Sequence, residues 1–199
     1  MSPRVKVLGF AGSLRKGSYN RALLNVAVEM APPTMVITVF DLTSIPLFNQ
    51  DVEDQDDPAP VKEFKEAIIR SDALLICTPE YNYSIPGVLK NALDWASRSD
   101  DIPSLYGKPV AVMGASNGMF GTARCQIALQ NLFISCNMHP LATHKILIAN
   151  APQKFDASGR LTDATTRKSV QESLGALVRW TLILQQGQAA LRKTLNGTA

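Results

Sequence analysis

Short apolar runs alternate along this chain with segments in which apolar residues recur at helical spacing. The runs at 73–78 and 109–114 are almost free of polar side chains, as is typical of parallel strands covered by helices on both faces. Two further runs at 4–10 and 34–40 precede them, and we expect a fifth strand near 145–149. Because helical segments separate the strands, the pattern predicts a three-layer α/β/α domain, doubly wound around a five-stranded parallel sheet.

The helical segments are recognised by apolar residues three and four positions apart. No linker rich in Pro, Gly or Ser divides the chain, so we expect residues 1–199 to form one domain. An acid-rich stretch at 51–58 is predicted to be a solvated loop ahead of a helix, with a partner-binding loop as the alternative. The predicted helices lie at 23–30, 61–70, 89–96, 129–136 and 170–181.

Composition excludes several classes of protein. Hydrophobic residues make up 46% of the chain, which is enough for a core and excludes intrinsic disorder. The net charge of +3 is too small to indicate a nucleic-acid partner. No apolar run approaches the ~18 residues of a membrane span, and residues 1–6 lack the apolar segment of a secretory signal.

The cysteines and histidines indicate neither disulfides nor a metal site. The three cysteines contain no C-x-x-C pair, so we expect a cytoplasmic protein in which Cys77 and Cys136 are packed thiols, while Cys125 is left open. His139 and His144 have no Cys or carboxylate at ligand spacing, so no metal is predicted.

Ligands of open α/β sheets bind beyond the carboxyl ends of the strands, where three loops are expected. The first loop, residues 12–20, reads GSLRKGSYN and precedes a predicted helix. Hydroxyls, an arginine and unpaired helix N–H groups favour an anion there. The loop lacks the Lys of a Walker A motif and the G-x-G-x-x-G of a dinucleotide site. It predicts a site for one phosphate, with a simple helix-capping turn as the alternative.

The second loop, residues 79–87, reads PEYNYSIPG. Its two prolines stiffen a loop that carries two tyrosines, and Pro86 is expected to be the first residue of the next helix. Rigid backbone groups beside flat apolar surface suit the edge of a planar heterocycle. The alternative is that the tyrosines only cover the end of the sheet.

The third loop, residues 114–121, reads GASNGMFG. Its first five residues match the G-x-S-x-G nucleophile elbow of α/β-hydrolases, which makes a serine esterase using Ser116 an alternative function. In those enzymes an acid and then a histidine follow the serine, yet no Asp or Glu lies between Ser116 and His144. We therefore expect this loop to bring small residues and backbone N–H groups close to a ligand.

Together, the first loop and the segment PEYNYSIPGVLKNALDW at 79–95 resemble the NAD(P)H-dependent FMN reductase family of flavodoxin-like flavoproteins, which includes quinone, chromate and azo-compound reductases. The similarity runs from about Val5 to the final helix. It implies a flavodoxin-like fold with FMN held by the three loops. The implied FMN-binding residues are Ser13, Arg15, Ser18 and Asn20 at the phosphate; Pro79, Glu80, Tyr81 and Asn82 along the isoalloxazine; and Ser116 and Gly118 on its pyrimidine side.

The resemblance also implies an activity. NAD(P)H would be the co-substrate and would reduce FMN, after which a quinone, a free flavin or a similar small molecule would take the hydride from flavin N5 in ping-pong turnover. No residue of the chain would then be an obligatory acid or base. A flavodoxin-like electron carrier without NAD(P)H oxidase activity is the alternative, but such carriers tend to be acidic, and the charge of +3 argues against it.

The resemblance implies a homo-oligomer, either a dimer or a tetramer. Tyr83 and Arg124 are expected to be structural or to meet a neighbouring subunit, and Trp95 and Trp180 to lie in the core or at a subunit interface. We expect neither nucleic acid nor a membrane as a partner.

Overall fold

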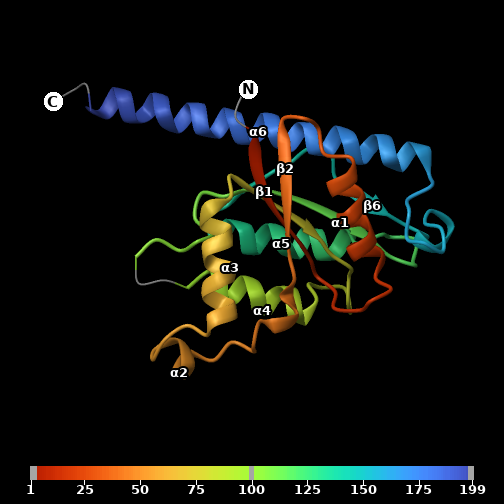
Figure 1. Cartoon of the computed structure of the whole chain (residues 1–199), viewed down its shortest axis with the longest axis horizontal. Helices are drawn as coiled ribbons and strands as arrows, with labels where there is room; N and C mark the ends of the chain where they lie inside the picture. Colours follow the sequence, from red (N-terminus) through yellow and green to blue (C-terminus); the bar gives the residue numbers. More distant parts are fainter. Residues whose placement is uncertain (1–3, 99–100, 197–199) are drawn as a thin grey trace.

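The computed structural model describes residues 4–98 and 101–196 and contains one parallel sheet (Figure 1). Residues 1–3, on which part of the leader prediction rests, lie outside the described residues. The sheet order is β2-β1-β3-β4-β5, with β6 also paired to β4, and every pairing is parallel. The predicted doubly wound fold is therefore confirmed. The strands are β1 (Val5–Ala11), β2 (Met35–Phe40), β3 (Ala73–Cys77), β4 (Pro109–Ala115), β5 (His139–Pro140) and β6 (Ile146–Ile148).

Helices cover both faces of the sheet. Alternate residues of β3 enter two separate cores: Leu75 packs with α1 and α6, whereas Leu74 and Ile76 pack with α3, α4 and α5. A strand buried on both faces must be apolar throughout, which explains its continuous apolar run. The helices are α1 (Tyr19–Glu29), α2 (Gln50–Glu53), α3 (Ala59–Arg70), α4 (Gly87–Ala96), α5 (Ala123–Ser135) and α6 (Ala164–Asn196), with short 3₁₀ turns at Leu42–Ser44 and Ala151–Gln153.

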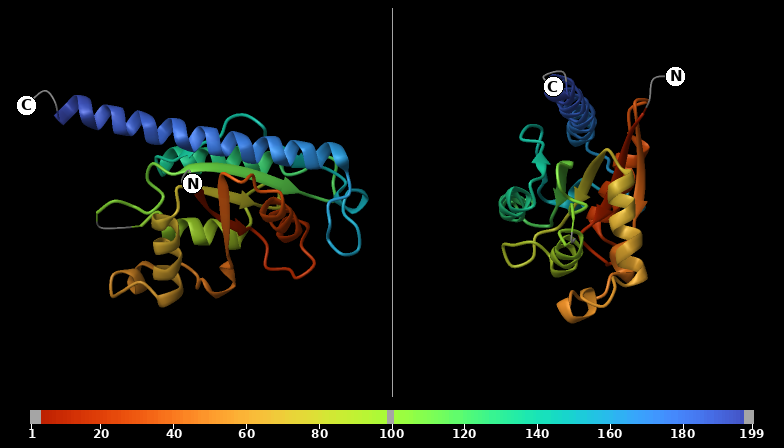
Figure 2. Two further views of the ribbon diagram at one scale, coloured as in Figure 1. Left: turned by 45° about the horizontal axis from the view of Figure 1, so that its top comes forward. Right: turned by 90° about the vertical axis from the view of Figure 1, so that its left-hand side faces the viewer.

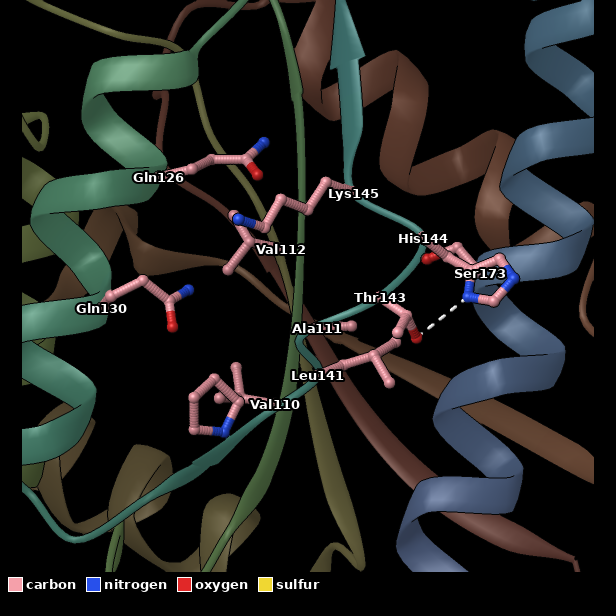
Figure 3. A pocket seen from close by; sticks show the side chains of 11 residues that line it. Val110, Ala111, Val112, Gln126, Gln130, Leu141, Thr143, His144, Lys145 and Ser173 are labelled. Carbon is pink, nitrogen blue, oxygen red and sulfur yellow. Dashed lines mark hydrogen bonds between the residues drawn. The ribbon is translucent and has the colours of Figure 1, made fainter.

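The fifth strand position is divided into two pieces. β5 pairs with Pro109 and Val110 at the start of β4, and β6 pairs with its end, from Met113 to Ala115. β6 matches the predicted fifth strand, whereas a two-residue strand such as β5 is too short to produce a periodic signal. Figure 3 shows the intervening segment with His144 and Thr143 in contact, between Gln130 of α5 and Ser173 of α6. The cavity there measures about 10 Å³, room for about one water molecule.

Three local predictions are refined by the structure. Helix α4 begins at Gly87, so Pro86 occupies its N-cap position rather than its first turn. The acid-rich stretch contains the one-turn helix α2, and Asp57 pairs with Lys65 of α3 at 2.6 Å. Its role as a partner-binding loop stays a prediction. Helix α6 extends well beyond the predicted 170–181, to Asn196.

The cysteines are free thiols, and burial raises the pKa of Cys77 and raises that of Cys125 to about 11. Cys136 is half-buried. Trp95 is fully buried, and the indole of Trp180 donates to the His139 carbonyl. Within the described ranges, no helix is long and apolar enough to cross a membrane, and no three metal-ligating side chains cluster.

Candidate functional site

The three loops come together at the carboxyl edge of the sheet. Backbone hydrogen bonds continue the strand register into them: Gly12 N–H donates to the Cys77 carbonyl at 2.8 Å, and Thr78 N–H donates to the Met113 carbonyl at 2.9 Å. Ser116 N–H donates to the Ile148 carbonyl in the same way. Gly12 must be glycine, because a Cβ there would lie 2.6 Å from the Thr78 hydroxyl oxygen. The predicted site residues thus share one edge of the molecule.

The first loop presents donors for an anion. Ser18 caps α1, and its hydroxyl accepts from the N–H groups of Asn20 and Arg21. In the part of the chain that the structure describes, the N–H groups of residues 13–17 donate to no protein acceptor. Arg15 is exposed, and its guanidinium lies beside Gly17. Free N–H groups beside a cation at a helix N-terminus fit a phosphate ester such as that of FMN.

Ser13 connects the first loop to the second. Its side chain is buried, with 4% of the residue exposed, and its hydroxyl oxygen lies 3.5 Å from the Tyr81 hydroxyl. Tyr81 itself is half exposed. Because Tyr81 is half exposed, the hydroxyls of Ser13 and Tyr81 can hydrogen-bond a ligand that lies between the two loops. This suits the predicted contacts of both residues.

Asn20 fastens the first loop to the third. Its amide nitrogen donates to the Ala115 carbonyl at 2.9 Å, and its amide oxygen accepts from the Ala115 N–H at 2.8 Å. The residue is only 2% exposed. Both polar atoms of its side chain are therefore engaged by the end of β4. The structure makes Asn20 a positioning residue, and its predicted contact with the phosphate stays a prediction.

The second loop is a tight turn with an unusual backbone. Tyr81 and Ser84 exchange two backbone hydrogen bonds, and the two residues between them, Asn82 and Tyr83, have φ of 50° and 64°. Positive φ at both central positions defines a type I′ turn, which usually contains glycine. The left-handed conformation costs about 1–2 kcal/mol for a residue such as tyrosine. The turn holds Asn82 and Tyr83 out into solvent.

Glu80 has a structural contact that its sequence position does not indicate. Its carboxylate accepts from the N–H groups of Arg124 at 2.8 Å and Cys125 at 3.0 Å, in the first turn of α5. The N-cap residue Thr122 makes no capping bond of its own, so Glu80 caps the helix from the second loop. Pro79 before it is buried. The predicted contact of Pro79 and Glu80 with isoalloxazine stays a prediction.

Arg124 lies between two exposed aromatic rings. Its guanidinium carbon is 4.1 Å from the Tyr83 ring centre and 4.5 Å from that of Phe120, and it pairs with Glu80 at 3.4 Å. The cluster joins the second and third loops beside the site. Phe120 carried no sequence signal, because only the turn of the third loop brings its ring to Arg124.

The third loop does not form an esterase site. The Ser116 hydroxyl accepts from the Gly118 N–H at 3.0 Å in a local turn. His139 pairs with Pro109 at the far end of β4, about 20 Å away at the rise of a strand. His144 lies two residues before Ile146, which itself pairs with Met113, about 10 Å along β4 from Ser116. Neither histidine can serve Ser116 as a base. Gly118 is exposed, and a Cβ at this position would lie 3.6 Å from the Ser116 hydroxyl oxygen, in ordinary contact.

The strand order, the polar loops at the carboxyl edge and the phosphate-type turn ahead of α1 define a flavodoxin-like domain. Residues 5–153 match the family model described as NADPH-dependent FMN reductase, and the chain belongs to that family. The predicted family, the enzyme class and the use of FMN with NAD(P)H are thereby confirmed at the level of the family.

Curated relatives and a solved structure agree with this assignment. The chain is 49% identical over 180 residues to an NAD(P)H-dependent FMN reductase of Pseudomonas aeruginosa, covering 90% of this chain and 97% of the relative. It is 41% identical to an NAD(P)H:quinone oxidoreductase of Solanum tuberosum, covering 88% and 92% of the two chains. The structure of FerB, a flavoenzyme NAD(P)H:(acceptor) oxidoreductase of Paracoccus denitrificans, superposes with a TM-score of 0.82 at 36% identity, covering 89% of this chain and 97% of FerB.

Proposed function

We propose that this chain is an FMN-dependent NAD(P)H oxidoreductase that reduces quinones, flavins or similar small acceptors by ping-pong turnover. The observation that carries the proposal is the convergence of the three loops, with the free N–H groups of residues 13–17 on one side and the tyrosine-bearing turn on the other. Relatives named as FMN and quinone reductases support the choice of acceptors.

The residues of the first loop would hold the FMN phosphate. Arg15 supplies a positive charge that no ion pair within residues 4–98 and 101–196 neutralises, and Ser18 caps the first turn of α1 next to the free N–H groups of residues 13–17. Ser13 adds a hydroxyl from a buried position. Charge-assisted hydrogen bonds of this kind are about twice as strong as neutral ones, which favours retention of a phosphate.

The second and third loops would shape the isoalloxazine site. Pro79, Tyr81 and Asn82 offer a stiff wall with an exposed aromatic ring, and Ser116 and Gly118 offer an opposite wall with little side-chain bulk. When bound, FMN supplies hydride acceptance from NAD(P)H and electron transfer to the acceptor. The chain contributes orientation and shape, and none of these side chains has to move a proton.

The fold limits where the nicotinamide can bind. One sheet and its helices account for residues 4–98 and 101–196, which leaves no second domain for a dinucleotide in those residues. The nicotinamide would therefore share the flavin site with the acceptor or bind against a second subunit, and in ping-pong turnover it would leave before the acceptor binds. A dimer or tetramer stays a prediction, as does the choice between NADPH and NADH.

Turnover and flavin retention test the proposal together. The purified protein is expected to bind added FMN and to consume NADH or NADPH steadily with benzoquinone, with parallel lines in double-reciprocal plots. Arg15→Gln is expected to raise the Kd for FMN about 10–100-fold, because hydrogen bonds to charged groups contribute about 1.5–3 kcal/mol. Arg70→Gln is the matched control, since Arg70 pairs with Glu66 at the surface of α3.

Each failure has a separate meaning. FMN binding without NAD(P)H consumption would favour the electron carrier. Absence of FMN binding would overturn the proposal. Hydrolysis of a nitrophenyl ester that Ser116→Ala abolishes would favour the esterase against the geometry described above.

A further inference from the structure

Helix α6 leaves the body of the protein before it ends. Figure 1 and the left view of Figure 2 show its last turns running past the sheet and the other helices. At the point of departure the Gln185 amide donates to the Asp72 carboxylate at 3.1 Å. Asp72 directly precedes β3, so this point lies at the amino edge of the sheet, opposite the three loops. We call residues 186–196 the arm.

One line of mostly apolar residues runs along α6 and continues into the arm, and we call this line the seam. Its positions alternate four and three residues apart, which is the heptad spacing of a coiled coil. The first four positions are fully buried against the sheet, while Leu184 is half-buried and Leu191 is 59% exposed. The seam therefore extends beyond the part of the protein that covers it. Its positions are Val170, Leu174, Leu177, Thr181, Leu184, Gln188 and Leu191.

The arm is a weak helix by its own composition. It extends about 16 Å at the rise of an α-helix and continues the packed part of α6, so its helical state depends on adding residues to an existing helix. Gly187, with no atom near its Cα, lowers the helix propensity by about 1 kcal/mol relative to alanine. A helix of this kind persists when another surface covers its apolar side.

The charges of the arm indicate which surface covers it. No Asp or Glu follows Glu172 in the sequence, so the arm carries only the positive charges of Arg192 and Lys193. Arg192 lies on the flank of the seam, on the same side as Gln185 and one heptad further along, whereas Lys193 lies on the outer face. The Asp72 carboxylate beside Gln185 accepts its two hydrogen bonds from neutral donors, the Lys6 N–H and the Gln185 amide.

We propose that the arm binds the arm of a second copy of this chain in antiparallel orientation. In this arrangement Leu191 of one copy packs at Gln188 of the other, and Arg192 lies beside Gln185 and Asp72 of the other. The two bodies stand at opposite ends of the paired arms, so they do not collide. Both sets of loops at the carboxyl edge remain open, because the arms leave from the amino edge.

The contact is short compared with a standard interface of about 1,600 Å². The association is therefore concentration-dependent, and it adds to any pairing made through other surfaces.

Sedimentation velocity over a range of concentrations of the full chain tests the proposal. The average particle mass is expected to rise towards twice its value at high dilution. Leu191→Glu is expected to lower the association constant at least tenfold, and Arg192→Glu at least threefold. Lys193→Glu, which makes the same charge change on the outer face, is the matched control and is expected to leave it within twofold. Unchanged melting temperatures confirm that each variant folds.

Charge exchange identifies the occupant as a second copy. Gln185→Lys combined with Arg192→Glu is expected to associate more strongly than Arg192→Glu alone, because positions 185 and 192 of one chain lie a full heptad apart and their new opposite charges can pair only between two arms. Gln185→Lys alone is the control for pairing of the new ammonium with Asp72 of its own chain. A mass that does not depend on concentration, or equal association of Leu191→Glu and the unaltered chain, overturns the proposal. So does a full chain that co-sediments with anionic phospholipid vesicles and does not self-associate, because the covering surface is then a membrane.

Discussion

Replacement of Asn20 by leucine tests whether the first and third loops are joined as the structure shows. The leucine has a similar volume but removes both hydrogen bonds to Ala115, which is 2% exposed. Each buried backbone group that loses its partner costs about 1–3 kcal/mol. Added apolar contact offsets part of this, so we expect the free energy of unfolding to fall by about 3 kcal/mol. The melting temperature of a domain of this size then falls by about 6–12 °C.

The assay is urea unfolding of the FMN-free protein, followed by circular dichroism, together with measurement of the Kd for FMN. Asn25→Ala is the control, because Asn25 is exposed on the same helix and should change stability by less than about 0.5 kcal/mol. Asn20→Asp adds a pH signature: its carboxylate repels the Ala115 carbonyl at neutral pH, and its protonated form donates to that carbonyl again in acid. Equal unfolding midpoints for Asn20→Leu and Asn25→Ala would refute the reasoning.

Three further predictions follow from other contacts. Glu80→Ala removes the cap of α5 and is expected to lower the free energy of unfolding by about 2–3 kcal/mol and to weaken FMN binding. Glu80→Gln is expected to be intermediate, because its amide oxygen still accepts a hydrogen bond. Equal unfolding midpoints for Glu80→Ala and the unaltered chain would contradict the cap. Gly114→Ala places a Cβ 1.8 Å from the Thr122 hydroxyl oxygen and is expected to destabilise the protein, whereas Gly87→Ala meets no atom within 4 Å and is expected to be neutral or stabilising in thermal unfolding; the opposite order would contradict the packing. The pKa of Asp156 is lowered from 3.8 to about 2, first by the Ser158 hydroxyl and then by the Arg160 N–H. Its contribution to stability is therefore complete above pH 3.8 and lost as the pH falls towards 2. Asp156→Asn is expected to flatten that part of the acid-unfolding curve, and an unchanged curve would contradict the assignment.

The contacts that assemble the site could not be predicted from the sequence. Asn20 meets Ala115 across 95 positions and Glu80 meets Arg124 across 44. The first pair depends on the register across β1, β3 and β4, and the second on the register between β3 and β4. No periodicity or motif encodes such a register. The resemblance implied a direct role of Asn20 at the phosphate, which stays a prediction, and the structure shows its side chain bound to the end of β4.

The sequence by itself determined the fold class and the place of the site. Short continuous apolar runs between helical segments are typical of strands buried on both faces, and parallel strands bring the loops that follow them to one edge. The segment at 79–95 was specific enough to indicate the family. Only the tertiary structure decided which side chains are engaged by the protein and which remain open to a ligand. It also decided that the seam of α6 extends beyond the sheet, because the exposure of the seam residues depends on where the rest of the molecule ends and not on the helix itself.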